Sequence, residues 1–328
     1  MLLPLHADPG NQPPPLDWVR LFTEWKWDWL FAIPAAIGLF GYLWLVWRLH
    51  RRGDRWPAIR TWSWSVGGIG TAVVAGMSSL GAYDTVLFSV HMVQHMMLTM
   101  ITPVFLAVGA PVTLLLRNLG KDGRRRVMKV MHSPPLRVLF FPPLATALLI
   151  TTPFALYLTE LYRYTLDVDW AHDLLHIYMV TVGCLFFFPL LGNDPMPNRL
   201  PYPMRILMLF ITMPAQAFLG TTIMGSSRLI AEDWYLAFGR AWPPSPIDDQ
   251  YIAGAIMWAT GDLTMGVIMA VLLAQWYKDS KREAARIDRQ LDREELLAAR
   301  RASAESTAQN HYDEADDRTV AETDGKDQ

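Results

Sequence analysis

The fold is decided by residues 86–106, which read VLFSVHMVQHMMLTMITPVFL. This run contains no Asp, Glu, Lys or Arg, and about 20 apolar residues are enough to cross the hydrocarbon core of a bilayer as an α-helix. Backbone N–H and C=O groups find no water in that core, so a spanning segment must be a helix or part of a closed barrel. An unbroken apolar run of this length indicates a membrane-spanning helix.

The rest of the chain repeats this pattern. Its 328 residues are 52% hydrophobic and 18% charged, with 14 Trp and 17 Met, which is too apolar for an ordinary soluble domain. We predict an all-α polytopic membrane bundle of seven transmembrane helices. The third apolar run continues past Leu106 to Leu116, so the sequence leaves its end open. The predicted spans are Trp29–Leu49, Trp62–Ala82, Val86–Leu106, Val138–Leu158, Ala171–Leu191, Met204–Met224 and Tyr251–Tyr277.

The Lys and Arg residues predict the orientation of this bundle. One set of loops, together with the start of the C-terminal tail, holds 19 of them, and the opposite set holds 5. Because cytoplasmic loops carry the excess of Lys and Arg, we expect the N-terminus outside and the C-terminus in the cytoplasm. The chain is therefore expected to be a multi-pass membrane protein.

Three regions follow from this topology. Residues 1–28 are expected to form an extracytoplasmic segment, which lacks the basic n-region of a signal peptide. Residues 29–277 form the membrane domain, and residues 278–328 lie in the cytoplasm. Within this last region, Lys278–Arg301 has the composition of a charged helix. Ser303–Gln328 has that of a disordered acidic tail.

Four of the eight histidines form two pairs with four-residue spacing inside predicted spans: His91/His95 and His172/His176. This spacing stacks both imidazoles of a pair on one helix face, one turn apart. A polar ring in a bilayer is costly, and imidazole is a ligand suited to copper or zinc. Both spans are expected to enter the membrane from outside, with His91 and His95 roughly 8 and 14 Å below the outer end of theirs. The pairs therefore predict one metal or haem site near the outer face.

Further candidates lie at the same end of the bundle. The seventh span brings Asp249 and Gln250 to the mouth of the site and Met257 about 10 Å inward, while Asp84 lies in the turn between the second and third spans. A thioether is a soft ligand that favours Cu(I), and the lone cysteine, Cys184, forms no paired-cysteine metal motif. Imidazole and thioether without thiolate, at an oxidising outer face, indicate copper.

Packing offers an alternative explanation for several of these residues. A single helical histidine pair can be hydrogen-bonded between helices, and methionine is a common gap-filler in helical cores, so Met257 fits a core position as well as a ligand position. Asp262, in the middle of the seventh span, is a functional candidate because an acid inside a membrane is costly. It can also be hydrogen-bonded to a neighbouring helix. The coincidence of two histidine pairs at matching depth is what favours a ligand site.

Several motifs in spans three to seven are shared with a known family. They are His91-Met-Val-Gln-His95-Met-Met-Leu, Gly109-Ala-Pro-Val-Thr-Leu-Leu-Leu-Arg117, His172-Asp-Leu-Leu-His176, the turn Gly192-Asn-Asp194-Pro195, and Asp249-Gln250 leading into Ala253-Gly254 and Met257-Trp258. In these motifs the chain resembles the CtaG family of cytochrome c oxidase assembly factors, in its caa-type oxidase branch. The resemblance adds Asp194 to the candidate residues. It does not extend to the first 60 residues or to the tail.

This resemblance implies a membrane protein that helps to mature a haem–copper cytochrome c oxidase by delivering copper to it, and that is not an enzyme. The implied partners are the oxidase subunits, an extracytoplasmic copper donor and the lipid bilayer, and the implied location is the bacterial cell (inner) membrane. Under this hypothesis copper binds among the four paired histidines, with Met257 as an additional soft ligand, and leaves by ligand exchange. The proposed ligands are His91, His95, His172, His176 and Met257.

Other functions are compatible with a buried histidine site. A haem-binding membrane oxidoreductase would use one histidine of each pair as an axial ligand, because about 6 Å between the members of a pair is too little for two stacked haems. A copper permease needs a polar path to the cytoplasmic side, for which Asp262, Gln216 and Cys184 are few. A zinc-dependent intramembrane hydrolase needs a Glu beside its histidine pair, and neither pair has one. No nucleic-acid role is indicated, because topology and anionic lipid account for the basic loops.

Overall fold

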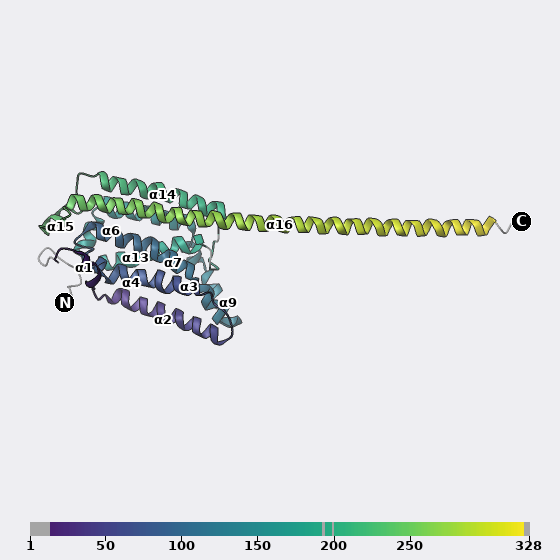
Figure 1. The fold of residues 1–328 in the computed structure, drawn as a ribbon, viewed down its shortest axis with the longest axis horizontal. Coiled ribbons are helices and arrows are strands. Elements are labelled where there is room, and N and C mark those ends of the chain that lie inside the picture. Colours follow the sequence, from purple (N-terminus) through teal and green to yellow (C-terminus); the bar gives the residue numbers. More distant parts are fainter. Residues whose placement is uncertain (1–13, 192–193, 199, 325–328) are drawn as a thin grey trace. The chain divides into compact units, whose positions relative to one another are not determined.

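The computed structural model describes residues 14–191, 194–198 and 200–324, with residues 301–324 described by their backbone alone. In this part of the chain every regular element is helical (Figure 1), which confirms the predicted all-α class. The elements are α1 (Trp18–Thr23), α2 (Trp29–Arg51), α3 (Ala58–Trp62), η1 (Ser63–Gly70), α4 (Thr71–Met77), α5 (Ser79–Tyr83), α6 (Phe88–Met96), η2 (Met97–Ile101), α7 (Thr102–Gly109), α8 (Pro111–Asn118), α9 (Lys121–Met131), α10 (Pro134–Leu139), α11 (Pro142–Leu158), α12 (Leu161–Asp167), α13 (Asp169–Leu191), α14 (Tyr202–Gly225), α15 (Glu232–Ala237) and α16 (Pro246–Asp324).

Six helical stretches of the described chain are long and apolar enough to cross a membrane, and a seventh is added if α11 and α12 form one span. The axes of this pair are bent by 73°. Helix α11 has 17 residues, at the lower limit for a span, and it ends at Leu158, followed by the C-cap residue Thr159, whose backbone is extended. The predicted fourth span is therefore the bent one. The side of the membrane on which each terminus lies stays a prediction.

The third span breaks where the sequence left its end open. Ala110 adopts a left-handed conformation with φ 50° and ψ 56°. It precedes Pro111, and a residue before proline is disfavoured in the right-handed helical region. Helix α8 begins at Pro111, and the Asp194 carboxylate accepts hydrogen bonds from the N–H groups of Val112 (3.1 Å) and Thr113 (2.7 Å). A side chain from a distant loop thus satisfies two of the free amides at the start of α8.

Helix α13 lies inside the bundle. Its apolar window is 61% buried, whereas that of α2 is 11% buried. A Cβ atom on Gly183 would lie 2.2 Å from the backbone oxygen of Thr99, so glycine is what allows α13 to approach η2 this closely, as is common between membrane helices. The π-helical segment η2 directly follows α6, the helix that carries His91 and His95. The histidines of α6 are therefore held near α13.

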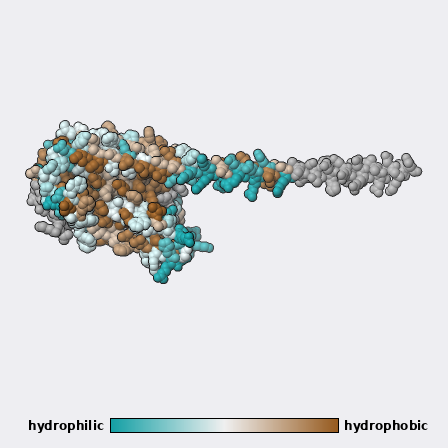
Figure 2. Space-filling view, in the orientation of Figure 1, coloured by the Kyte–Doolittle hydropathy of each residue, from teal (hydrophilic) through white to brown (hydrophobic). Residues whose placement is uncertain are grey.

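Large apolar side chains cover the outside of the bundle. Ile37 and Phe40 of α2, and Phe210 and Phe218 of α14, are each more than 60% exposed. Figure 2 shows apolar residues over much of the bundle face in view. Exposed apolar surface on this scale is what a bilayer covers, so the chain is a multi-pass membrane protein.

Residues Leu273–Gln328 form a second compact unit. The side chains of residues 278–300 are exposed, in agreement with their charged composition. The backbone is helical through Asp324, and Ala and Glu, which favour helix, recur throughout this segment. The disorder predicted from Ser303 onward stays a prediction. Residues 325–328 lie outside the described residues.

Candidate metal centre

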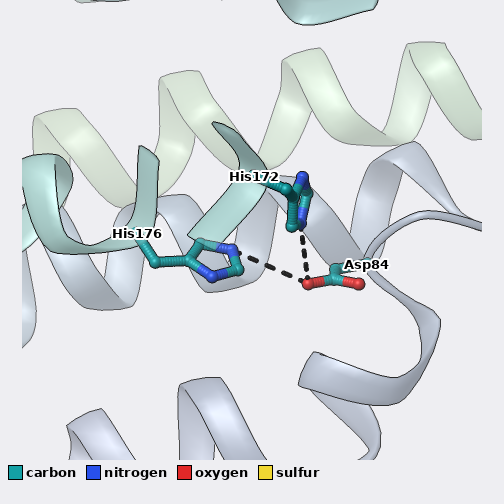
Figure 3. A group of neighbouring side chains, drawn as sticks. All are labelled: Asp84, His172 and His176. Atoms are coloured by element: carbon teal, nitrogen blue, oxygen red, sulfur yellow. Dashed lines mark hydrogen bonds and ion pairs between the residues drawn. The ribbon is translucent and has the colours of Figure 1, made fainter. Parts of the chain in front are cut away.

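Three buried side chains converge near the start of α13. The Nε2 atom of His172 lies 3.1 Å from Asp84 Oδ2, and that of His176 lies 3.7 Å from the same oxygen. Figure 3 shows both imidazole rings beside the Asp84 carboxylate, with lines from their nitrogens to its oxygen. One ligand atom from each residue fits in a group whose members all lie within 4.8 Å of one another. Two imidazoles and a carboxylate are a donor set that suits copper or zinc.

The local helices set this geometry. His172 and His176 lie one turn apart on the buried face of α13, in its first two turns, as the four-residue spacing predicted. Asp84 is the C-cap residue of the short helix α5. The turn that follows is fixed by Trp234 of α15, whose Nε1–H donates to the backbone oxygen of Thr85 at 2.9 Å. The Asp84 carboxylate thus comes from the connection that follows α5, and both imidazoles come from α13.

The charge of Asp84 is stabilised by its neighbours. Burial opposes ionisation of this carboxyl group, but the hydrogen bond and charge interaction with His172, together with Lys26 and His176, hold its pKa below the ordinary value. Lys26 is itself only 4% exposed. Asp84 therefore stays a carboxylate through the physiological range, and it provides a fixed negative charge for a cation.

The side chain of Gln94 orients His176. Its Nε2 donates to the backbone oxygen of Ala75 at 3.1 Å, so its Oε1 faces His176 Nε2 at 3.0 Å. An amide oxygen only accepts hydrogen bonds, so His176 Nε2 carries the proton in this contact. An ion that binds this nitrogen must displace that proton.

The second histidine pair is bridged by a tyrosine. The hydroxyl of Tyr157, on α11, lies 3.1 Å from His91 Nε2 and 2.9 Å from His95 Nδ1. The ring centroid of His91 is 6.5 Å from that of His95 and 6.0 Å from that of His172, and the His172 and His176 centroids are 4.6 Å apart. The structure brings the two predicted pairs together. It gathers the closest ligand atoms around Asp84, with His91 beside that group and His95 next to His91.

Asp249 has a structural contact with the histidine-bearing helix. Its carboxylate accepts hydrogen bonds from the N–H groups of Phe88 (2.7 Å) and Ser89 (3.3 Å). These are the first two residues of α6, so Asp249 caps the helix that carries His91 and His95. Its role in the structure is to position that pair.

Gln250 secures the loop before α15. Its Oε1 accepts from the N–H of Ile230 at 2.7 Å, and its Nε2 donates to the backbone oxygen of Arg228 at 3.0 Å. Both of these amide contacts are with backbone groups, which is typical of a loop-fixing side chain. Asp194, as described above, caps α8.

Met257 and Asp262 lie on α16, outside the group around Asp84. Met257 is fully buried in the main apolar core of the bundle. One carboxylate oxygen of Asp262 is buried and has no hydrogen-bond partner among the described residues, and the same is true of Gln216 Oε1. The structure gives no hydrogen bond between Met257 or Asp262 and the histidines, so the ligand role of Met257 and the functional role of Asp262 stay predictions.

Asp194→Ala is expected to lower the free energy of unfolding by about 1–2 kcal/mol, because it leaves the first amides of α8 without their acceptor. Thermal unfolding of the detergent-solubilised protein measures the change. The matched control is Asp122→Ala, at an exposed position in the first turn of α9, with an expected change within about 0.5 kcal/mol. Equal effects of the two substitutions would contradict the capping role.

Sequence reasoning missed three residues that shape the site: Tyr157, Gln94 and Lys26. Tyr157 and Gln94 each carried a signal, because each is a polar side chain within a predicted span and such groups need a partner. Lys26 carried a weaker signal, because it is one of the few basic residues that the predicted topology places on the outer side. Their partners lie on other helices, which no local pattern specifies.

Comparison with known proteins finds a matching family model and relatives from mycobacteria. The model of a family described as cytochrome c oxidase caa3 assembly factor matches residues 40–279. Uncharacterized proteins of Mycobacterium bovis and Mycobacterium tuberculosis are each 35% identical over 288 residues, or 86% of this chain, and one of Mycobacterium leprae is 35% identical over 287 residues, or 85%. The chain spans only 43% of the length of these relatives. No solved structure matches.

Proposed function

The chain belongs to the cytochrome c oxidase caa3 assembly factor family, and from this premise we propose that it binds copper within its membrane domain and delivers it to the oxidase. The observation that carries the proposal is the buried group formed by Asp84, His172 and His176, whose ligand atoms lie within 4.8 Å of one another. A haem–copper oxidase requires copper during its assembly, and this group offers donors that copper accepts. Copper is thus the cargo of a carrier that catalyses no reaction.

The chemistry of the group suits a site that must also release its ion. It contains no thiolate, the ligand that holds Cu(I) most firmly. The proton on His176 Nε2 competes with the ion for the same nitrogen. His91, whose ring centroid is 6.0 Å from that of His172, supplies the next imidazole. In this proposal copper arrives from an extracytoplasmic donor, binds near Asp84 and passes by ligand exchange to an oxidase subunit docked in the bilayer.

Deletion of the gene, followed by complementation, tests the proposal. We expect the deletion strain to lack oxidase activity and to contain oxidase depleted of copper. The wild-type gene should restore both, and the His91→Ala/His172→Ala variant should restore neither at equal expression. Normal, copper-loaded oxidase in the deletion strain would refute the assembly role. A Soret band from the purified protein would instead support the haem-binding alternative.

Copper binding is expected to weaken as the pH falls, because protonated imidazole cannot bind a metal. The pKa of Asp84 is held below its ordinary value by its neighbours, so this carboxylate stays charged and does not contribute to the loss. Titrating the purified protein with copper between about pH 8 and pH 5 measures the effect. Affinity that stays constant over this range would contradict imidazole ligation.

A further inference from the structure

The hydrogen bonds between His91, Tyr157 and His95 restrict which of their atoms carry protons. The Tyr157 hydroxyl contacts His91 Nε2 at 3.1 Å and His95 Nδ1 at 2.9 Å, and all three side chains are at most 3% exposed. A hydroxyl has one proton to donate, and a neutral imidazole has one N–H and one bare nitrogen. Tyr157 therefore donates to one ring and accepts from the other.

Two arrangements of protons satisfy this chain. If Tyr157 donates to His95 Nδ1, then His95 carries its proton on Nε2, His91 donates through Nε2, and His91 Nδ1 is bare. If Tyr157 donates to His91 Nε2, then His91 carries its proton on Nδ1, His95 donates through Nδ1, and His95 Nε2 is bare. In both arrangements the two rings have the same tautomer. The two nitrogens that do not contact Tyr157, called the outward nitrogens, are His91 Nδ1 and His95 Nε2, and one of them has a free lone pair.

The two outward nitrogens lie in different surroundings. His91 Nδ1 and His95 Nε2 are buried and have no hydrogen-bond partner among the described residues. The His91 ring lies beside His172 of the Asp84 group. The His95 ring instead lines a small cavity of about 10 Å³ with Thr99, Thr152 and Tyr178. In each arrangement the nitrogen that is bare can therefore take a ligand, beside the Asp84 group in one arrangement and beside Thr99 in the other.

We propose that Tyr157 makes His91 Nδ1 and His95 Nε2 mutually exclusive ligands for copper, so that the ion occupies the end beside the Asp84 group or the end beside Thr99, and moves between them. This inference rests on the proposed copper-carrying function. Binding at one end fixes the proton arrangement that closes the other end. Copper therefore cannot bind to both histidines at once, and His95 belongs to a second binding position instead of being a fourth ligand of one site.

The movement of the ion balances in protons. When copper leaves His91 Nδ1, that nitrogen gains a proton, and when copper binds His95 Nε2, that nitrogen loses one. Within the chain one proton passes from His91 Nε2 to the Tyr157 oxygen, and the tyrosine proton passes to His95 Nδ1. The proton that His95 Nε2 releases is matched by the one that His91 Nδ1 takes up, with solvent water as the proton acceptor at one end and the proton donor at the other, so no net proton and no electron is gained or lost.

The first test uses the metal-free protein. In ¹⁵N NMR spectra of the full-length protein with labelled histidine, we expect His91 and His95 to have the same tautomer in the wild type. Tyr157→Phe should uncouple the two rings. The matched control is Tyr162→Phe, because the Tyr162 ring also lies near His91, at 4.8 Å between centroids, but its hydroxyl bonds to Tyr235 at 2.7 Å. Opposite tautomers in the wild type would overturn the proposal even if Tyr157→Phe failed to fold.

The second test adds Cu(I), which is diamagnetic, under reducing conditions. In the wild type and in Tyr162→Phe, the ligated fractions of His91 Nδ1 and His95 Nε2 should sum to no more than one at saturation. In Tyr157→Phe the sum should rise toward two. Simultaneous ligation of both nitrogens in the wild type would overturn the proposal. If Cu(I) ligates no histidine although the wild-type tautomers are coupled, the copper-carrying function fails, and the tyrosine coupling stands on the metal-free result.

Discussion

Replacing both His172 and His176 with alanine is expected to lower the copper affinity of the purified protein by more than about 100-fold. Loss of a residue that only supports a metal ligand costs 10- to 100-fold in affinity, and this variant removes two of the three ligands in the Asp84 group. Equilibrium competition with a copper chelator of known affinity measures the change. The same variant should fail to restore oxidase assembly in the deletion strain.

The chain offers a matched control for this double substitution. His50 and His132 are both exposed and lie outside the group around Asp84. The His50→Ala/His132→Ala variant removes the same number of imidazoles, and we expect it to keep the wild-type affinity. Equal copper binding by the two variants would place the site elsewhere in the molecule.

Asp84→Asn is expected to lower the free energy of unfolding by about 3–5 kcal/mol at pH 7, because it removes the negative charge from a buried set of charged and polar partners. His172 loses an ionic acceptor, and Lys26, which is 4% exposed, loses a nearby opposite charge. Unfolding of the detergent-solubilised protein by denaturant measures the loss. Copper affinity should fall with it.

The control for this substitution is Asp54→Asn. Asp54 pairs with Arg117, but both side chains are about 40% exposed, so the expected loss is below about 1 kcal/mol. The pH dependence supplies a second check. The folded pKa of Asp84 is lowered from the ordinary value, so its contribution is present above about pH 4 and is lost as the pH falls further. The difference between wild type and Asp84→Asn should therefore shrink only in strong acid.

Much of the membrane domain could be predicted from the sequence because its information is local. A long apolar run by itself predicts a membrane-spanning helix, and a four-residue spacing places His172 and His176 on the same helix face whatever surrounds them. The predicted fourth span ended at Leu158, as α11 does, but the 73° bend into α12 was not predictable from composition. The break at Ala110 was signalled by the following proline.

The partners of the histidines depended on packing between helices. Asp84 was predicted at the correct end of the bundle, yet its direct contact with His172 required α13 to lie beside the turn after α5. The Tyr157 bridge required α11 to face α6, which neither helix specifies alone. Asp249 was predicted at the mouth of the site, but its hydrogen bond to the backbone of α6 was not predicted.

That backbone contact has a consequence for the order of biosynthesis. Phe88 and Asp249 are 161 residues apart in the chain, and a ribosome makes the helix with His91 and His95 long before it makes the carboxylate that completes its first turn. The nascent protein therefore cannot present a finished pocket while its early spans are being inserted. Completion of the site therefore requires the synthesis and insertion of α16, the helix that supplies Asp249.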